Sequence, residues 1–280
     1  MKKPKILLVD DEKMMRFTLS KILEINDFDV TTASNVPEAL ALINESAFDI
    51  LLSDLHMPGA GDGLTVVSAM RHANPHAVTI LFSAYPQMGA ATDAILMQTD
   101  QILVKPMNVH ALIEAINQRL AAGAPEPRTV ETVATILERT SDLCIQDWIA
   151  RVQSEEKLTV VDLANPVRAA HLPQVFRDLV TRLRSFKSLG TKELRSNAAT
   201  DHGVARRRQG YTAAMMVEES RILQVSIFQT LQDNLSTIDF SVLLIGVMTI
   251  ADEVDSQLSQ AMESYIAESL RGPLPDLLPA

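Results

Sequence analysis

Hydrophobic and polar positions follow two different periods along the first 120 residues of the chain. Short continuous apolar runs occur at residues 6–9, 30–33, 49–53, 78–82 and 102–104. Between them, apolar residues recur with helical spacing over residues 13–25, 36–46, 63–73, 87–98 and 108–121. Continuous apolar strands that alternate with helices of about 10–15 residues are typical of a parallel sheet with helices on both faces. The pattern therefore predicts an α/β domain with a doubly wound, five-stranded parallel sheet.

The pattern changes after residues 121–129, a stretch rich in proline, glycine and alanine that is typical of a linker. Beyond it, apolar positions keep helical spacing only. Helices are expected near residues 130–152, 173–186, 192–208, 212–234 and 236–269. Ser236, with Asp239 three residues later, is expected to cap the last helix, and Gly272-Pro273 to end it. The predicted parts are an α/β domain at 1–122, a linker at 123–128, an all-α helical bundle at 129–271 and a disordered tail at 272–280.

Composition and charge narrow the classes of protein that fit this pattern. The formal net charge is −10, which argues against nucleic acid as the main partner. A single cysteine, Cys144, excludes an intramolecular disulfide. The N-terminus does not have the pattern of a signal peptide, and the apolar segment 240–251 is too short to span a bilayer. We therefore expect a cytoplasmic protein without a membrane partner.

Polar side chains occur where the predicted strands end, and in open α/β sheets ligands bind beyond these carboxyl ends. The residues at these ends are Asp10 and Asp11, Asp54, Ser83 and Ala84, and Lys105 and Pro106. Clustered carboxylates repel one another unless a cation lies among them. Oxygen ligands with room for water suit Mg²⁺. The sequence therefore predicts a magnesium site at this edge of the sheet.

Asp54 is the candidate nucleophile at this edge. Carboxylates attack phosphoryl groups to give an aspartyl phosphate. The metal, Lys105 and Ser83 would hold the phosphoryl oxygens during transfer. Asp11 alone is explained equally well as a helix cap, because it precedes a predicted helix. The five polar residues Asp10, Asp11, Asp54, Ser83 and Lys105, at the ends of the first, third, fourth and fifth strands, are explained better by a phosphoryl site than by unrelated caps.

Four motifs resemble those of the receiver domain of two-component response regulators. They are ILLVDDE at 6–12, SDLHMPGAGDGL at 53–64, SAY at 83–85 and VKP at 104–106. The resemblance covers residues 4–122 and implies a flavodoxin-like fold. It also implies a histidine kinase as the partner that supplies the phosphoryl group. The domain itself would have no enzyme activity beyond self-catalysed phosphorylation and dephosphorylation.

The resemblance assigns a role to each motif residue. Asp54 is the phosphoacceptor, and Mg²⁺ is held by Asp10, Asp11 and Asp54 with the backbone carbonyl of His56. Ser83, Ala84 and Lys105 contact the phosphoryl group or act in the switch, and Pro106 follows a cis peptide bond. Family members usually carry Tyr or Phe three residues before the lysine, whereas this chain carries Ile102. Tyr85 is the alternative switch residue.

A basic stretch in the helical half, TDHGVARRRQGYT at 200–212, allows three interpretations. The arginines could bind DNA, although no helix-turn-helix pair surrounds them. His202 could carry a phosphoryl group in a phosphotransfer bundle. The plainest interpretation is that Arg206–Arg208 form a solvated helix face, with His202 packed or capping. A haem or metal site at His171 and His202 lacks the paired spacing that such sites usually have.

The same stretch is similar to the amino-terminal helical domain of RsbT co-antagonist (stressosome) proteins. The similarity rests on His202, Arg206, Gln209, Gly210 and Tyr211, followed by a long helix that bears a glutamate and an Arg-x-Leu sequence. It implies a sensory or interaction module of globin-like character. The resemblance assigns no individual role to these five residues.

The sequence as a whole predicts a phosphorylation-controlled response regulator. Phosphorylation of Asp54 would change how the helical domain contacts a downstream protein partner, or would pair two chains in a homodimer. Small-ligand sensing by the helical domain remains open. Two alternatives are a DNA-binding transcriptional regulator with a divergent helical output, and a phosphotransfer or enzymatic output domain that uses His202.

Overall fold

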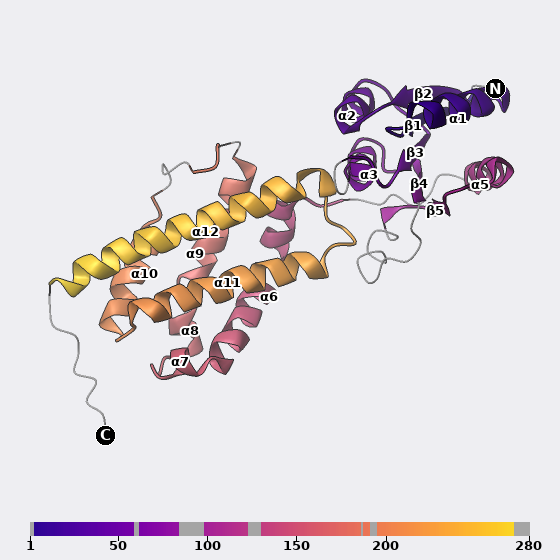
Figure 1. The fold of residues 1–280 in the computed structure, drawn as a ribbon. Helices are drawn as coiled ribbons and strands as arrows, with labels where there is room; N and C mark the ends of the chain where they lie inside the picture. The colour runs from indigo at the N-terminus through magenta and orange to yellow at the C-terminus, as the bar shows by residue number, and fades with distance from the viewer. Residues whose placement is uncertain are drawn as a thin grey trace. The chain divides into compact units, whose positions relative to one another are not determined.

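The chain forms two compact units in a computed structural model (Figure 1). The structure describes residues 3–58, 62–83, 98–122, 130–185, 187–190 and 195–271. The first unit contains Met1–Glu131 together with Leu235–Leu243. The second unit contains Thr132–Asn234 and Leu244–Ala280. No described helix is both long enough and apolar enough to cross a membrane.

The first unit is built on a parallel sheet in the order β2-β1-β3-β4-β5. Its strands are β1 (Lys5–Val9), β2 (Asp29–Ala33), β3 (Ile50–Asp54), β4 (Val78–Ser83) and β5 (Gln101–Val104). Every residue of β3 and β4 is buried, whereas β2 and β5, at the two edges, are partly exposed. The five-stranded parallel sheet predicted from the apolar runs is confirmed, and this strand order is that of flavodoxin-like folds.

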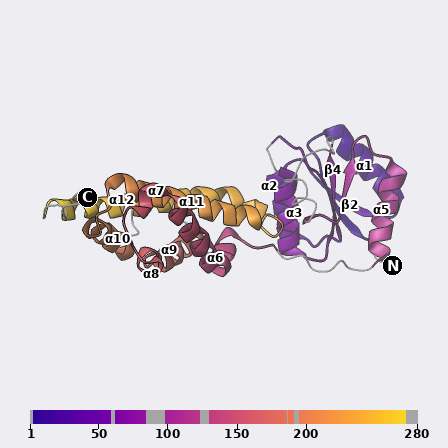
Figure 2. The same ribbon diagram turned by 90° about the horizontal axis from the view of Figure 1, so that it is seen from below.

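Helices cover both faces of the sheet because successive strand residues point to opposite sides. The described helices of this unit are α1 (Lys13–Ile25), α2 (Val36–Glu45), α3 (Asp62–Ala73) and α5 (Val109–Ala121). Leu7 and Leu51 pack under α2 and α3, whereas Ile6 and Ile50 pack under α1 and α5. Figure 2 shows these two pairs of helices on opposite sides of the strands. The helix expected at 87–98 lies outside the described residues except for Gln98.

A segment from late in the sequence, residues 235–243, packs within the first unit. The Gln98 side-chain amide donates hydrogen bonds to the backbone carbonyls of Leu235 and Ile238, both at 2.9 Å. Ser68 on α3 donates to the Gln98 amide oxygen at 3.3 Å and accepts from the Phe240 backbone N–H at 3.1 Å. Gln98 and Ser68 are both buried. The 235–243 segment is therefore held by two interior polar side chains rather than by surface contacts alone.

This packing explains why the last helix begins later than the sequence predicts. The helix α12 spans Phe240–Ser269, so Ser236 is not its cap. Asp239 takes that place, since its carboxylate accepts from the Ser241 backbone N–H at 2.9 Å. The backbone just before α12 is hydrogen-bonded to Glu131 instead. The Glu131 N–H donates to the Thr237 carbonyl at 2.7 Å, and the Asp239 N–H donates to the Glu131 carbonyl at 2.8 Å. A helix cannot begin where the backbone is engaged in such a bridge.

The second unit is helical, as its apolar spacing predicts. Its helices are α6 (Val133–Ser154), α7 (Glu156–Thr159), α8 (Asn165–Arg168), α9 (Leu172–Arg184), α10 (Asn197–Arg208), α11 (Ala213–Asp233) and α12 from Leu244 onward. The helix α6 packs against α9 and α11. The short helices α7 and α8 were not predicted, because a helix of one turn is too short to show apolar periodicity.

A buried carboxylate, Glu219 on α11, organises the interior of the second unit. Arg206 Nε donates to Glu219 Oε2 at 2.9 Å, and the Tyr211 hydroxyl donates to Oε1 at 2.8 Å. The Trp148 indole N–H donates to the Glu219 backbone carbonyl at 3.1 Å. Arg206 also donates to the Gln209 side-chain oxygen at 2.8 Å. Burial raises the pKa of Glu219, and Arg206 opposes that rise.

The expectation that Arg206–Arg208 form a solvated helix face is wrong. Arg206 and Arg207 are buried, because each has a polar partner in the interior. The partner of Arg206 is Glu219, and Arg207 Nε donates to the Ser269 hydroxyl on α12 at 2.6 Å. Only Arg208 is exposed.

Glycines in the same stretch allow close packing and a chain reversal. A Cβ atom at Gly203 would lie 2.0 Å from the Ala261 backbone oxygen, so α10 and α12 can meet there only without a side chain. Gly210 has φ of +87° just after α10, a left-handed conformation that favours glycine at the end of a helix. The stretch 200–212 therefore serves the packing of the second unit.

Two histidines, His171 and His202, stack beside the Glu219 carboxylate. The imidazole rings of His171 and His202 have centroids 3.7 Å apart and planes 23° apart. Burial, assisted by the positive charge of Arg206, lowers the pKa of His202 to about 3. Burial, His202 and Arg206 hold the pKa of His171 well below its usual 6.5. Both rings are therefore neutral at neutral pH.

The depressed histidine pKa values predict that the second unit loses stability in mild acid. Below pH 6.5 the unfolded chain binds protons that the folded unit excludes, so stability falls with pH until about pH 3. At pH 5 His202 alone should lower the free energy of unfolding by about 2 kcal/mol relative to pH 7. Urea unfolding followed by Trp148 fluorescence reports on this unit alone, because the chain has a single tryptophan.

In the His202→Gln variant, the drop in the free energy of unfolding between pH 7 and pH 5 should be about 2 kcal/mol smaller than in wild type. The matched control is His72→Gln, at an exposed position on α3, which should leave it unchanged. An equal drop between pH 7 and pH 5 in wild type and His202→Gln would contradict the assignment.

Candidate functional site

The carboxyl ends of the strands bring the predicted polar residues to one edge of the sheet. Asp10 follows β1, and Asp54 is the last residue of β3. Ser83 ends β4 and pairs in register with Val104, the last residue of β5. Lys105 follows directly, and its backbone N–H donates to the Ser83 carbonyl at 2.8 Å. Because β1, β3, β4 and β5 are successive neighbours, all four ends lie along one rim.

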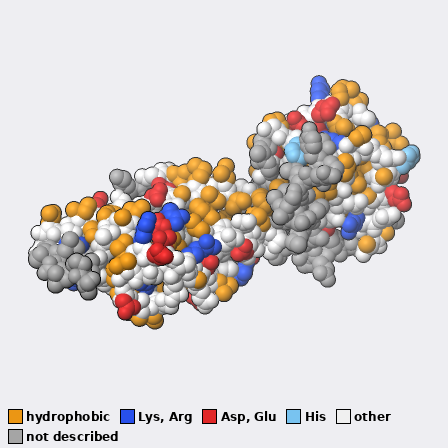
Figure 3. All heavy atoms as spheres, turned by 60° about the horizontal axis from the view of Figure 1, so that its bottom comes forward, with side chains coloured by type: hydrophobic (Ala, Val, Ile, Leu, Met, Phe, Trp, Pro, Cys, Tyr) orange, Lys and Arg blue, Asp and Glu red, His pale blue; other side chains and the backbone are white. Residues whose placement is uncertain are grey.

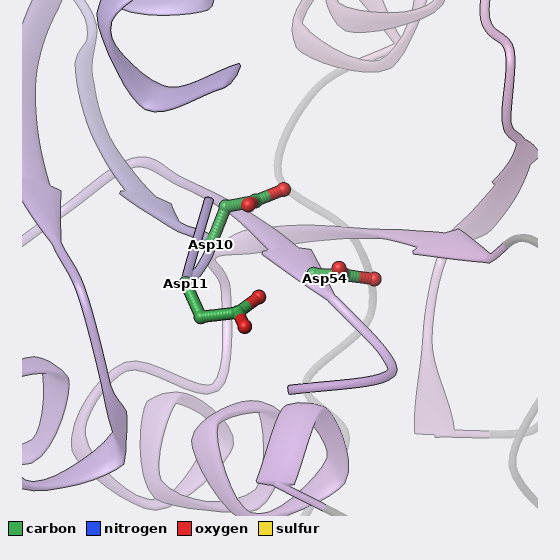
Figure 4. A group of neighbouring side chains, drawn as sticks. All are labelled: Asp10, Asp11 and Asp54. Atoms are coloured by element: carbon green, nitrogen blue, oxygen red, sulfur yellow. The ribbon is translucent and has the colours of Figure 1, made fainter. Parts of the chain in front are cut away.

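Three carboxylates face one small space at this rim (Figure 4). One oxygen from each of Asp10, Asp11 and Asp54 lies within 4.8 Å of the other two. Asp10 and Asp54 are buried, whereas Asp11 is exposed. Within the described ranges, no other group of three or more His, Cys, Asp or Glu side chains gathers in this way. The donor set is all oxygen with one side open to water, which is the chemistry that suits Mg²⁺.

Lys105 is the cation that the protein itself supplies to the cluster. Its Nζ lies 2.8 Å from Asp54 Oδ2 and 3.1 Å from Asp10 Oδ2. Burial lowers the pKa of Lys105, but the hydrogen bonds to Asp54 and Asp10 outweigh it, so the pKa is raised. Burial raises the pKa of Asp10, against the hydrogen bond from Glu12 and the pairing with Lys105. Lys105 therefore remains charged between the two carboxylates.

Backbone N–H groups fix the orientation of the two buried carboxylates. Glu12 N–H donates to Asp10 Oδ1 at 2.8 Å, and His56 N–H donates to Asp54 Oδ1 at 3.2 Å. In each carboxylate the other oxygen, Oδ2, is the one that Lys105 contacts. Each oxygen thus keeps acceptor capacity beyond its present bond, since a carboxylate oxygen has two lone pairs.

Gly63 is a residue of this site that the sequence analysis did not single out. A Cβ atom there would lie 2.4 Å from the Asp54 carbonyl oxygen and 2.7 Å from the Leu55 Cα atom. The first turn of α3 can therefore approach the residues after Asp54 only because position 63 is glycine. Its place in the motif at 53–64 was the available signal.

The remaining predicted residues fall in three places. At the rim, Ser83 is buried, His56 is exposed, and the Lys105–Pro106 peptide bond is cis. Ile102 is partly buried against the core under α2 and α3. Ala84 and Tyr85 lie outside the described residues. The five helical-motif residues belong to the second unit; of these Arg206, Gln209 and Tyr211 join the hydrogen bonds around Glu219, His202 lies 3.6 Å from its carboxylate, and Gly210 ends α10.

Sequence reasoning also missed the polar pair that holds the 235–243 segment. Gln98 and Ser68 carry no motif, and their partners lie more than a hundred residues away. Behind them Arg71 is buried, donates to the Gln98 carbonyl at 3.3 Å and forms a buried ion pair with Asp100 at 2.7 Å. A buried arginine is visible in sequence only as an isolated charge on an apolar helix face.

The first unit is similar in sequence to known proteins. The profile of the response regulator receiver domain matches residues 6–117. Chemotaxis protein CheY of Bacillus subtilis is 33% identical over 117 residues, which are 41% of this chain and 97% of CheY. The alginate biosynthesis transcriptional regulatory protein AlgB of Pseudomonas aeruginosa is 35% identical over 122 residues, 44% of this chain and 26% of AlgB. The chain therefore spans about a quarter of the length of AlgB.

One solved structure with this similarity is the receiver domain of the Francisella response regulator 1452. It is 29% identical, and the match covers 42% of this chain and 98% of that one, with a TM-score of 0.39. AlgB is by name a transcriptional regulator, so the comparisons give no support to the expectation that nucleic acid is not a partner.

The match to CheY covers nearly all of that protein, and the acidic rim stands where the motifs at 6–12, 53–64 and 104–106 predicted it. Receiver domains bind Mg²⁺ in an acidic pocket, and this chain has an acidic cluster of Asp10, Asp11 and Asp54 at the rim. The chain belongs to the response regulator receiver family through residues 6–117.

Proposed function

We propose that Asp54 accepts a phosphoryl group from a cognate histidine kinase and that this changes the contacts of the helical second unit. The observation that carries the first half is the cluster at the rim. Asp54 shares one space with Asp10 and Asp11 while Lys105 contacts its Oδ2 atom at 2.8 Å. A nucleophilic carboxylate, further acidic ligands and a cation for the phosphoryl oxygens are the groups that aspartyl phosphate formation needs.

Asp10, Asp11, Asp54 and the backbone carbonyl of His56 would hold Mg²⁺ in this proposal. The fit rests on the all-oxygen donor set and on the acceptor capacity that Asp10 and Asp54 retain beside their backbone and Lys105 bonds. When bound, the ion neutralises negative charge on the phosphoryl oxygens.

The remaining steps belong to the side chains of this chain. A carboxylate oxygen of Asp54 attacks phosphorus, and the phosphorus–nitrogen bond to the kinase histidine breaks, with its electron pair staying on the imidazole. Lys105, now on Asp54 Oδ2, would move its ammonium group to a phosphoryl oxygen. Ser83, at the end of the neighbouring strand, would donate a hydrogen bond from its hydroxyl group to another phosphoryl oxygen. Ile102 offers less area than the usual aromatic residue, so we expect a smaller shift at its position than in receivers that carry Tyr or Phe there.

The 235–243 segment is the proposed route from the rim to the second unit. It lies in the first unit, held by Gln98 and Ser68, and α12 continues from it into the second unit. A phosphoryl group can shift an equilibrium only if two conformations contact it differently. We propose that these conformations differ in how Gln98 and Ser68 hold the segment.

For the second unit we propose an interaction or sensory role, on its resemblance to the helical domain of RsbT co-antagonist proteins. Its output would be a contact with a downstream protein or with a second copy of the chain. Phosphotransfer through His202 fits poorly, because this ring is stacked on His171 and its side chain is only 12% exposed.

DNA binding through the basic stretch also fits poorly with the geometry. Arg206 and Arg207 are buried, and Arg208 pairs with Glu268 at 2.8 Å. Other exposed arginines of this unit are likewise paired, Arg184 with Glu138 and Arg221 with Glu218. Figure 3 shows basic and acidic side chains side by side on one face of the helical part. Binding to DNA needs cations that are free to neutralise phosphates.

Asp54→Asn should abolish phosphorylation while the fold persists, because asparagine keeps the shape of the side chain without the nucleophile. Wild-type protein incubated with acetyl phosphate and Mg²⁺ should gain one phosphoryl group by intact-protein mass spectrometry. The matched control is Asp29→Asn at the exposed start of β2, at the opposite end of the strands, which should be labelled like wild type. Labelling of Asp54→Asn, or undiminished labelling of wild type in excess chelator, would refute the assignment.

Gln98→Leu should loosen the 235–243 segment without affecting phosphorylation of Asp54. The change removes the hydrogen bonds from Gln98 to the carbonyls of Leu235 and Ile238 and the one that Gln98 accepts from Ser68, so exchange of the Phe240 amide hydrogen should speed up by about tenfold or more. Gln118→Leu is the control, because its amide only contacts Glu114 on the exposed face of α5. Unchanged exchange in Gln98→Leu would show that this side chain does not hold the segment.

A further inference from the structure

Arg16 is a cation beside the acidic rim that acts on the backbone rather than on a carboxylate. It lies in the first turn of α1 and is partly buried. Its Nη1 atom donates to the backbone carbonyl of Asp10 at 2.6 Å, a short distance even for a charged donor. Lys105, in contrast, contacts the Oδ2 atoms of Asp10 and Asp54. Lys105 and Arg16 therefore act on different parts of the acidic cluster.

The carbonyl that Arg16 holds belongs to the peptide group between two of the proposed metal ligands. This group is planar, so the orientation of the Asp10 carbonyl also sets the direction in which the chain continues into Asp11. Other bonds hold the amide and the side chain of Asp10: its N–H donates to the Ala33 carbonyl at 3.3 Å, and its Oδ1 atom accepts from the Glu12 N–H at 2.8 Å. Among the described residues, no backbone N–H donates to the Asp10 carbonyl. The Arg16 guanidinium thus holds the orientation of this peptide group.

Asp11 depends on this peptide group for the direction of its side chain. Asp11 is exposed, so the backbone rather than surrounding side chains determines where its carboxylate points. One of its oxygens nevertheless lies within 4.8 Å of an oxygen of Asp10 and of Asp54 (Figure 4). Mg²⁺ demands near-ideal octahedral geometry from its ligands. A rotated peptide group would turn the Asp11 carboxylate away and weaken metal binding.

The positive charge of Arg16 acts against metal binding, whereas its hydrogen bond to Asp10 favours it. The repulsion between the guanidinium and Mg²⁺ is screened by solvent, because Arg16 is partly exposed. Arg16 also acts on Glu38 of α2, whose pKa is lowered chiefly by hydrogen bonds from Ser34, with a smaller contribution from Arg16. Loss of a side chain that orients a metal ligand typically weakens metal binding by about tenfold to a hundredfold. We therefore expect the hydrogen bond to be the larger effect.

We propose that Arg16 is a positioning residue of the metal site, which fixes the peptide group between Asp10 and Asp11 and so directs both carboxylates toward Mg²⁺. In this role Arg16 contacts neither the ion nor the phosphoryl group. The inference rests on the proposed magnesium site at Asp10, Asp11 and Asp54. It adds to that site a residue that lies outside the motifs at the strand ends.

The test measures Mg²⁺ binding to the unphosphorylated full chain, so it does not depend on phosphoryl transfer. The backbone amide signals of Asp11 and Asp54 in ¹⁵N-labelled protein are the readout, and both should shift saturably in wild type. Arg16→Met removes the donor and should raise the dissociation constant for Mg²⁺ about tenfold. Arg16→Lys keeps a charged donor for a single carbonyl, so its dissociation constant should stay within about threefold of the wild-type value.

Lys13→Met is the matched control, because Lys13 is an exposed cation at the first residue of α1 and does not contact the Asp10 carbonyl. Its dissociation constant should match that of wild type or be slightly smaller, since a repelling charge is gone. In metal-free Arg16→Met the ¹³C signal of the Asp10 carbonyl should also shift, because that oxygen has lost its donor, whereas in Lys13→Met it should not. Thermal unfolding followed by circular dichroism verifies that each variant is folded.

Two results would overturn the proposal. One is tighter Mg²⁺ binding by Arg16→Met than by wild type, which would mean that Arg16 acts through its charge. The other is an unchanged dissociation constant in Arg16→Met together with a lower unfolding temperature, which would mean that Arg16 only stabilises the fold. Failure of the magnesium site itself looks different. Wild type would then show no saturable shift at Asp11 and Asp54, or Asp11→Asn would bind Mg²⁺ as tightly as wild type.

Discussion

Like charges gathered at one edge of a sheet must be neutralised, and this requirement organises the first unit. The strand order places β1 beside β3, so the carboxylates of Asp10 and Asp54 lie close together. Lys105 reaches them from β5 across β4, and its ammonium group bridges the two Oδ2 atoms. The same arrangement makes the rim responsive to its ligands. A phosphoryl group on Asp54 adds negative charge, and Lys105 must then divide its hydrogen bonds differently.

A second buried carboxylate has the same role for the helical unit, with a different outcome. Glu219 is held by Arg206 and Tyr211 in the interior, and α6 joins through the indole of Trp148. All of these groups have partners, so we expect this cluster to fix the packing rather than to react. The neighbouring Gln257 is the exception, since its oxygen has no donor in the protein.

The sequence predicted the parts of the structure that depend on local patterns. Strand bounds, the edge that carries Asp10, Asp54, Ser83 and Lys105, and the helical second half all follow from apolar runs and their spacing. It failed where distant residues decide. Ser236 is a reasonable cap from the local sequence alone, but the backbone that follows it is hydrogen-bonded to Glu131. The burial of Arg207 depends on Ser269 in another helix, and no local pattern carries that information.

The account depends most on the claim that a phosphoryl group at Asp54 changes how the first unit holds the 235–243 segment. Hydrogen exchange at the backbone amides of Asp239 and Phe240 tests it directly, because these N–H groups donate to Glu131 and Ser68 within that unit. Exchange would be compared with and without acetyl phosphate and Mg²⁺, in wild type and in Asp54→Asn. The account predicts a change of about tenfold or more in wild type and none in the variant. Identical rates before and after complete phosphorylation of the wild-type protein would contradict it.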